Sequence, residues 1–119
     1  NILAVAHLGD AVLELLARSY LFSDYHSSNN EIHKKTIEIV SAKAQSVALE
    51  IIMPCFTEEE MSFYKRGRNA KVKAVPKNTD TVVYHRSCGI EAVFGYLYLT
   101  GQSERINEIF DIGFKNLIK

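Results

Sequence analysis

Two carboxylates near the start of the chain have the type and spacing needed for metal-dependent chemistry. Asp10 and Glu14 lie four residues apart, which is one turn of a helix. His7 and Arg18 continue the same helical stripe, and the opposite side of this segment is mostly apolar. Gly9 is unfavourable in a helix by about 1 kcal/mol relative to Ala, which indicates that another backbone passes close by. A carboxylate pair in such a place requires a cation or hydrogen-bond donors.

A third carboxylate, Glu91, lies in a second stretch with the pattern of a buried helix. Small residues surround it on its stripe, and Gly95 follows one turn later. Gly89 and Gly95, with Gly9 on the first helix, would let the two helices approach closely, which would bring Asp10 and Glu91 together. Two carboxylates in one buried site repel each other unless a divalent cation lies between them. The alternative is that each acid pairs with a base. The candidate pairs are Asp10 with Arg18 and Glu91 with Arg86 or another base.

A basic stretch forms the third candidate site. Residues 61–79 carry six basic side chains and no acidic one, in a chain whose formal net charge is zero. A phosphate backbone is the expected partner of such a segment. The alternative is a solvated loop beside the acidic triplet at residues 58–60. The candidate RNA-binding residues are Lys65, Arg66, Arg68, Asn69, Lys71, Lys73, Lys77 and Asn78.

Length and composition exclude several other classes of protein. The 119 residues fit one domain, taken as residues 1–119, and 47% of them are hydrophobic, enough for a core. No apolar run reaches the roughly 18 residues of a membrane span, and no signal peptide is visible. Cys55 and Cys88 lack metal-type spacing, so we expect reduced thiols and a cytoplasmic protein. The sequence shows no zinc pattern, catalytic triad, phosphate-binding glycine loop or dinucleotide fingerprint.

The apolar periodicity is helical almost throughout, so the predicted fold class is all-α. The expected helices cover residues 2–22, 31–39, 42–52, 58–66, 79–99 and 104–118, with polar loops at 23–30 and 69–78. Ser41, Thr57 and Ser103 are the expected N-caps, and Gly101 is the expected C-terminal stop. Four residues are candidates for a helix–helix dimer seam. They are Leu8, Val93, Tyr96 and Leu97.

Several motifs resemble those of a known family. Residues 8–14 (LGDAVLE) resemble the ribonuclease III signature, in which a Leu-Gly-Asp core supplies a metal-binding aspartate. Residues 90–99 (IEAVFGYLYL) resemble the second acidic motif of that family, whose glutamate binds the same metals. Further stretches are similar to the small subfamily called Mini-III ribonuclease. They are VSAKAQ at 40–45, KRGRNAK at 65–71, VPKNTD at 75–80 and GYLYLTGQ at 95–102.

The resemblance covers essentially the whole chain and implies a function. It implies a homodimeric, magnesium-dependent endoribonuclease acting on double-stranded RNA, with Mn²⁺ as a substitute ion. Asp10 and Glu91 would be the catalytic metal ligands, and Glu14 an outer-shell group. Mini-III proteins are similar to the catalytic domain alone, so we expect no double-stranded-RNA-binding domain. The expected substrate is precursor of the large-subunit (23S) ribosomal RNA, with a ribosomal protein as a candidate helper.

The chain also departs from the longer family members. Acids of that family are replaced here by Leu3, Ala6 and Cys88. Fewer carboxylates predict weaker metal binding, with waters completing the shell. Two alternative functions follow: a non-catalytic RNA-binding or ribosome-associated dimer of the same fold, or a plain helical interaction module. The presence of both Asp10 and Glu91 argues against the first, and the basic stretch argues against the second.

Overall fold

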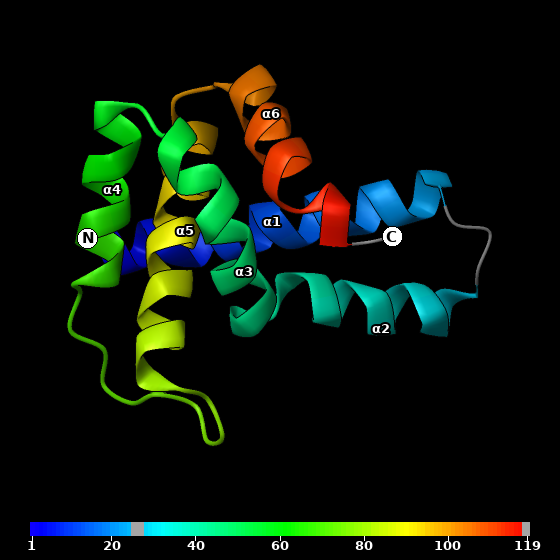
Figure 1. The fold of residues 1–119 in the computed structure, drawn as a ribbon, viewed down its shortest axis with the longest axis horizontal. Helices are drawn as coiled ribbons and strands as arrows, with labels where there is room; N and C mark the ends of the chain where they lie inside the picture. Colours follow the sequence, from blue (N-terminus) through cyan, green and yellow to red (C-terminus); the bar gives the residue numbers. More distant parts are fainter. Residues whose placement is uncertain (25–27, 118–119) are drawn as a thin grey trace.

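The computed structural model describes residues 1–24 and 28–117, and no β-strand occurs among them. The prediction of an all-α fold is confirmed (Figure 1). None of the described helices is both long enough and apolar enough to span a membrane. The α-helices are α1 (Ile2–Asp24), α2 (Asn29–Val40), α3 (Ala42–Ile52), α4 (Glu58–Arg68), α5 (Thr81–Leu99) and α6 (Ser103–Gly113). Short 3₁₀ helices cover Met53–Cys55 (η1) and Lys115–Leu117 (η2).

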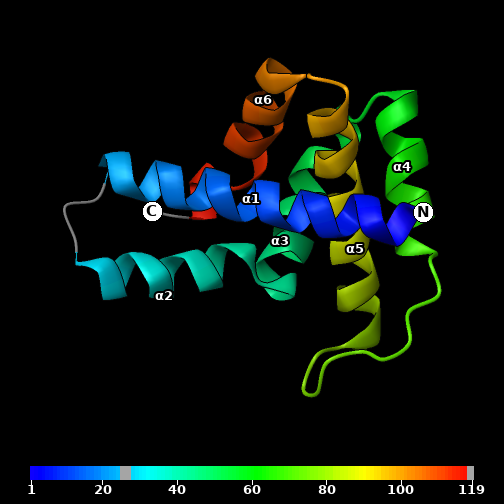
Figure 2. The same cartoon turned by 180° about the vertical axis from the view of Figure 1, so that it is seen from behind.

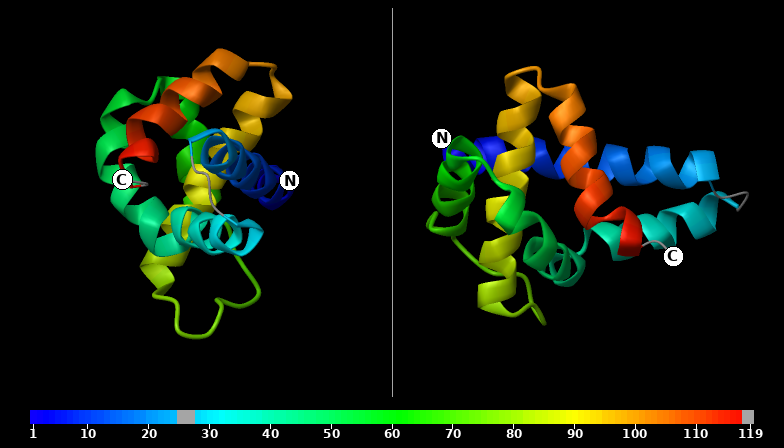
Figure 3. Two further views of the ribbon diagram at one scale, coloured as in Figure 1. Left: turned by 90° about the vertical axis from the view of Figure 1, so that its right-hand side faces the viewer. Right: turned by 45° about the horizontal axis from the view of Figure 1, so that its top comes forward.

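Helix α5 is the central element. Helices α1, α3 and α4 pack around it (Figures 1 and 2), while α1 and α2 run antiparallel beside each other (Figure 3). Buried residues occur on every side of α5, because its sequence is apolar or small all round. Ile90, Phe94 and Leu97 of α5 meet Leu13 of α1 and Leu49 of α3 in one core. The helix that carries Glu91 is therefore held on several sides at once.

Side-chain caps fix where the helices around the site begin. The Ser41 side chain accepts a hydrogen bond at the start of α3, as predicted. Thr57 and Glu60 form the predicted capping box of α4. Asp80 caps α5 by accepting from a backbone N–H, so this helix begins at Thr81, later than expected. These caps define the α2–α3 corner and both ends of the basic segment.

Several predicted boundaries were wrong by a few residues. Helix α1 continues to Asp24 and α2 begins at Asn29, which shortens the expected loop 23–30; residues 25–27 lie outside the described ranges. Helix α4 continues to Arg68. Gln102, without a side-chain cap bond, occupies the N-cap of α6, so the prediction of Ser103 as cap was wrong. Helix α6 ends at Gly113 and a 3₁₀ turn follows; residues 118 and 119 are also outside the described part.

The predicted dimer seam needs a correction. Val93 and Leu97 are fully buried in the core of the protomer, so their side chains cannot contact a second copy. Tyr96 is only half-buried, and its ring stacks on Phe63 with the centroids 4.2 Å apart. Leu8 is also half-buried. Sequence periodicity could not separate these cases, because every face of α5 is apolar.

Candidate active site

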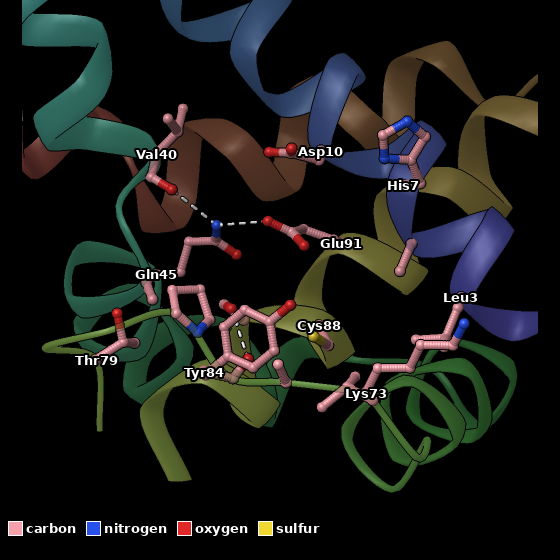
Figure 4. Close-up of a pocket in the computed structure, with 16 residues that line it drawn as sticks. Leu3, His7, Asp10, Val40, Gln45, Lys73, Thr79, Tyr84, Cys88 and Glu91 are labelled. Atoms are coloured by element: carbon pink, nitrogen blue, oxygen red, sulfur yellow. Dashed lines mark hydrogen bonds between the residues drawn. The ribbon is translucent and has the colours of Figure 1, made fainter. Parts of the chain in front are cut away.

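A pocket of about 700 Å³ lies where four segments of the chain meet. They are the first half of α1, the α2–α3 corner, the loop at residues 69–80 and the first half of α5. Figure 4 shows the side chains of Asp10, Glu91 and Gln45 around one space, each from a different helix. Tyr84, Ser87 and Cys88 lie one or two turns before Glu91 on α5 and also line the pocket.

A backbone contact between α1 and α5 positions the two acids. A Cβ atom added to Gly9 would lie 1.7 Å from the carbonyl oxygen of Glu91. A Cβ atom added to Gly95 would lie 2.1 Å from the carbonyl oxygen of Val5. Since no side chain fits at either place, glycine is required there. The prediction that the helices touch at their glycines is confirmed for Gly9 and Gly95 and wrong for Gly89, which packs against Tyr64 of α4. Asp10 and Glu91 line the same pocket.

Glu91 has a strongly perturbed ionisation. Burial raises its pKa, a hydrogen bond from Gln45 lowers it, and the adjacent Asp10 raises it again, with a net pKa of about 8. A metal-free pocket therefore favours the protonated form of Glu91. A cation between the two acids would reverse this preference, because opposite charge stabilises the carboxylate.

Gln45 of α3 is a pocket residue that we did not select from the sequence. Its amide nitrogen Nε2 donates to Oε2 of Glu91 at 3.0 Å and to the carbonyl oxygen of Val40 at 2.9 Å. The side chain is buried, and its Oε1 atom has no hydrogen-bond partner among the described residues. A signal was present: Gln45 lies on the apolar face that α3 forms with Ala48, Leu49 and Ile52. A buried polar residue at a core position calls for a partner.

The donor set fits a hard divalent cation. Asp10 and Glu91 offer carboxylate oxygens, and Gln45 Oε1 is a buried oxygen without a donor. Magnesium is commonly held by one or two carboxylates and keeps several waters. The described residues contain no group of three or more His, Cys, Asp or Glu that could hold an ion. Waters and phosphate oxygens would therefore complete the shell, in line with the weak binding that we predict.

Cys88 does not replace the missing family acid. Burial raises the pKa of its thiol, and the negative charge of Glu91 raises it further, against weaker opposing hydrogen bonds. The thiol is therefore neutral at ordinary pH, whereas metal binding to sulfur requires the thiolate. His7 lines the pocket from α1 and is exposed.

The other predicted acid and the proposed ion pairs lie elsewhere. Glu14 is not among the pocket-lining residues, and its carboxylate accepts from Arg18 Nη2 at 2.8 Å. Arg86 pairs with Glu50 at 2.7 Å. The alternative that these two arginines neutralise Asp10 and Glu91 is therefore not supported. The structure does not bring Glu14 to the pocket that contains Asp10 and Glu91.

The basic residues divide into two groups. Lys65, Arg66 and Arg68 lie in the last turn of α4, where cations also complement the helix dipole. The guanidinium groups of Arg66 and Arg68 lie over aromatic rings of the same helix, 4.9 and 5.5 Å from the ring centroids. The second group follows in the loop, and all of its side chains are exposed. Lys73 also lines the pocket, and the other members are Asn69, Lys71, Lys77 and Asn78.

An all-helical fold in which the acids of both motifs line one pocket matches the expectation for a ribonuclease III catalytic domain. The sequence profile described as Ribonuclease III domain matches residues 3–102. The chain belongs to the ribonuclease III family. It is therefore an endoribonuclease, and the alternative of a non-catalytic relative is set aside.

Curated relatives define the branch of this family. The chain is 43% identical over 113 residues to Mini-ribonuclease 3 of Staphylococcus aureus, covering 93% of this chain and 84% of that protein. It is 42% identical over 107 residues to Mini-ribonuclease 3 of Symbiobacterium thermophilum, covering 90% of this chain and 82% of that protein. A crystal structure of a Fusobacterium nucleatum protein superposes with a TM-score of 0.86 at 30% identity, covering 98% of this chain and 93% of that chain. The resemblance to Mini-III ribonucleases is thus confirmed.

Proposed function

We propose that this endoribonuclease cleaves double-stranded RNA with a divalent cation bound at Asp10 and Glu91, and that precursor 23S ribosomal RNA is its substrate. The observation that carries the proposal is the convergence of these two acids in one pocket beside a basic loop. Mg²⁺ is the proposed ion, and Mn²⁺ is its substitute, because both accept oxygen ligands.

The residues of the chain have separate roles in this reaction. When bound, the divalent cation supplies an activated water and stabilises the leaving oxygen of the phosphodiester. Asp10 and Glu91 hold the cation, and the contact at Gly9 sets the separation of the helices that carry them. The hydrogen bond from Gln45 favours the charged form of Glu91. The protein therefore positions charge, and no side chain of the pocket is required as a nucleophile.

The basic residues form the proposed RNA surface. An A-form duplex is recognised mainly by its shape, through phosphates and 2′-hydroxyl groups. Lys73 lies at the pocket, and the exposed side chains of Lys71 and Lys77 extend the positive charge along the loop. Lys65 and Arg66 add charge at the end of α4. These side chains would bind the phosphate backbone on either side of the cleaved bond.

We also propose that two copies act together. The outer face of α1 exposes Ala11, Leu15 and Phe22, an apolar stripe beside the half-buried Leu8. A symmetric contact would place two active sites on one duplex, one for each strand. A ribosomal protein that presents the precursor RNA is a further proposed partner, and the cytoplasm is the proposed compartment.

The test removes the charge of each proposed ligand while its shape is kept. Asp10→Asn and Glu91→Gln should each slow Mg²⁺-dependent cleavage of long duplex RNA by more than the roughly 100-fold typical of losing an outer-shell partner. Duplex binding in EDTA should stay unchanged, since these acids do not contact RNA phosphates without a cation. Glu50→Gln, an exposed acid on the neighbouring α3, is the matched control. Full activity of Asp10→Asn, or wild-type cleavage in EDTA, would contradict the proposal.

A further inference from the structure

Gln45 shows an imbalance in its hydrogen bonds. Both of its amide donors are used, while its buried oxygen has no partner. We propose that Gln45 is a positioning residue of the metal site: Nε2 fixes one oxygen of Glu91, and Oε1 receives a hydrogen bond from a water of the bound cation. This inference rests on the proposed metal-dependent function and assigns a role to the VSAKAQ motif.

The α2–α3 corner explains why a glutamine reaches the site. Val40 is the last residue of α2, so its carbonyl has no partner within that helix. Ser41 is extended, with φ −60° and ψ 153°, and its side chain caps α3. Gln45 lies one turn into α3 and reaches back to the Val40 carbonyl at 2.9 Å. This bond anchors the amide between the corner and α5.

The two acceptors fix which way the amide points. Nε2 lies 3.0 Å from a carboxylate oxygen of Glu91 and 2.9 Å from the Val40 carbonyl oxygen. A flipped amide would place Oε1 against the Val40 carbonyl oxygen, which is repulsive because neither oxygen has a hydrogen to share. The chemistry of the neighbours therefore assigns the nitrogen, and Oε1 must be the free atom.

Burial makes the free oxygen informative. The Gln45 side chain is 1% exposed, and buried polar atoms are normally paired with protein or ordered water. The residue lines the pocket that contains Asp10 and Glu91, and Figure 4 shows its amide oxygen within that space. Magnesium retains several waters, each of which is a strong hydrogen-bond donor. Because this oxygen is almost fully enclosed, a water of the cation would satisfy Oε1 once the neighbouring side chains shift enough to admit it.

A neutral amide suits this role better than a charged side chain. A lysine at this place would offer donors to both acceptors, yet its charge would compete with the cation for Glu91. A glutamate would add a third negative charge and could not donate when ionised. Glutamine donates to Glu91, accepts from water and leaves the net charge of the site to the cation. Such outer partners orient the ligand that they touch.

The experiment measures binding of Mn²⁺ alone, by electron paramagnetic resonance of the free ion, without RNA. Gln45→Met has a similar length and no polar atoms, and it should weaken Mn²⁺ binding about 10- to 100-fold. Excess Mn²⁺ should restore kcat on duplex RNA while KM for RNA stays at the wild-type value, because the buried side chain touches no RNA. A loss of folding would instead lower activity at every Mn²⁺ concentration.

A second variant keeps the donors of the amide without its acceptor. Gln45→Lys keeps donors for Val40 and Glu91 but removes the acceptor and adds a charge that competes with the cation, so the uncharged Gln45→Met variant is the one that tests the amide without an added charge. For Gln45→Lys the proposal predicts loss of Mn²⁺ binding with the melting temperature preserved. The matched control is Thr36→Val. This substitution removes a different buried polar group, the Thr36 hydroxyl of α2, which donates to the Ile32 carbonyl.

The outcomes distinguish this inference from the proposed function. If Glu91→Gln loses Mn²⁺ binding and a folded Gln45→Met keeps wild-type affinity, the role of Gln45 is overturned and the metal site stands. If Glu91→Gln itself binds Mn²⁺ like the wild type, both the site and this inference are wrong. Weakened binding in both Gln45 variants, with Thr36→Val unaffected, would support the proposal.

Discussion

At Glu91, burial and charge oppose each other. The residue sits on the central helix with its backbone against Gly9, and its side chain faces Asp10 without a base between them. A plain core position would carry an apolar residue, and a plain surface acid would keep its ordinary pKa. This combination is what we expect of a residue whose charge is balanced by the proposed cation.

The raised pKa of Glu91 predicts that the metal-free protein loses stability as pH rises. Its pKa is 4.5 in the unfolded chain and about 8 when folded, so between these values the folded state binds more protons. The stabilising proton is fully present below the unfolded value and is lost as pH rises through the folded value. Glu91→Gln should therefore raise the free energy of unfolding in EDTA at pH 8 by about 2 kcal/mol, a value reduced for partial exposure, and by much less at pH 5.

Thermal melting at the two pH values checks this prediction. Mg²⁺ should raise the melting temperature of the wild type at pH 8 and leave that of Glu91→Gln unchanged, since only the carboxylate binds the ion. Glu50→Gln, at an exposed acid of α3 that pairs with Arg86, is the control for removal of a carboxylate. Equal stabilisation by Glu91→Gln at both pH values would show that its proton is not responsible.

The sequence identified part of this site by residue type alone. Asp10 and Glu91 stood out because each is an acid among small and apolar neighbours, with a glycine on the same helix. Gln45 escaped notice because its partners are Val40 and Glu91, and the second contact depends on how the α2–α3 corner meets α5. Glu14 shares the stripe of Asp10, but its bond to Arg18 holds it outside the pocket.

At the scale of elements, the end of α4 and the loop after it supply most of the local positive charge. The arginines of α4 lie over aromatic rings, so replacing them would also disturb packing. Lys71 and Lys77 are exposed loop residues and report on charge more directly. They are the suitable positions for testing the RNA surface.

Lys71→Ala combined with Lys77→Ala should weaken binding to duplexes of every sequence and reduce its dependence on salt. Each lost phosphate contact should flatten the slope of log K against log salt by about 0.7 to 0.9, by analogy with DNA. Binding in EDTA at several salt concentrations is the measurement. The matched control is Lys34→Ala with Lys43→Ala, two exposed lysines of α2 and α3. An unchanged slope in the loop variant would support the alternative that the loop is a solvated surface without phosphate contacts.

Helix order and most caps were predictable because they depend on neighbours in the chain. Thr57 and Ser41 act locally, and the structure confirms them. The burial of Val93 and Leu97 was not predictable, since an apolar residue has the same pattern whether it faces its own core or a partner. Only the packing of α1, α3 and α4 around α5 decides between the two.

At the scale of the molecule, the exposed stripe on α1 is the proposed contact between two copies. Leu15 and Phe22 are 65% and 77% exposed, unusual for large apolar side chains on one helix face. We expect a dimer at micromolar concentration in sedimentation equilibrium. Leu15→Glu should shift it toward monomer, because the interface would then bury an unpaired charge.

Ile37→Glu provides the comparison for the dimer prediction. Ile37 is 53% exposed on α2, so the substitution adds the same charge to a similarly apolar position away from α1. It should leave the dimer intact. A monomeric wild type would contradict the dimer itself. If Ile37→Glu dissociated the dimer while Leu15→Glu remained dimeric, the contact would lie elsewhere than on α1.

The joint between α1 and α5 has a consequence for how such a site could be rebuilt. Gly9 and Asp10 are adjacent, and Glu91 supplies both the carbonyl that Gly9 touches and the facing carboxylate. The backbone contact between the helices and the two facing carboxylates therefore depend on the same short segments, and Gly95 lies one turn after Glu91. A designer who wished to graft this site onto another pair of crossing helices would have to transfer these four residues as one module, because moving either acid without its glycine would change the spacing between them.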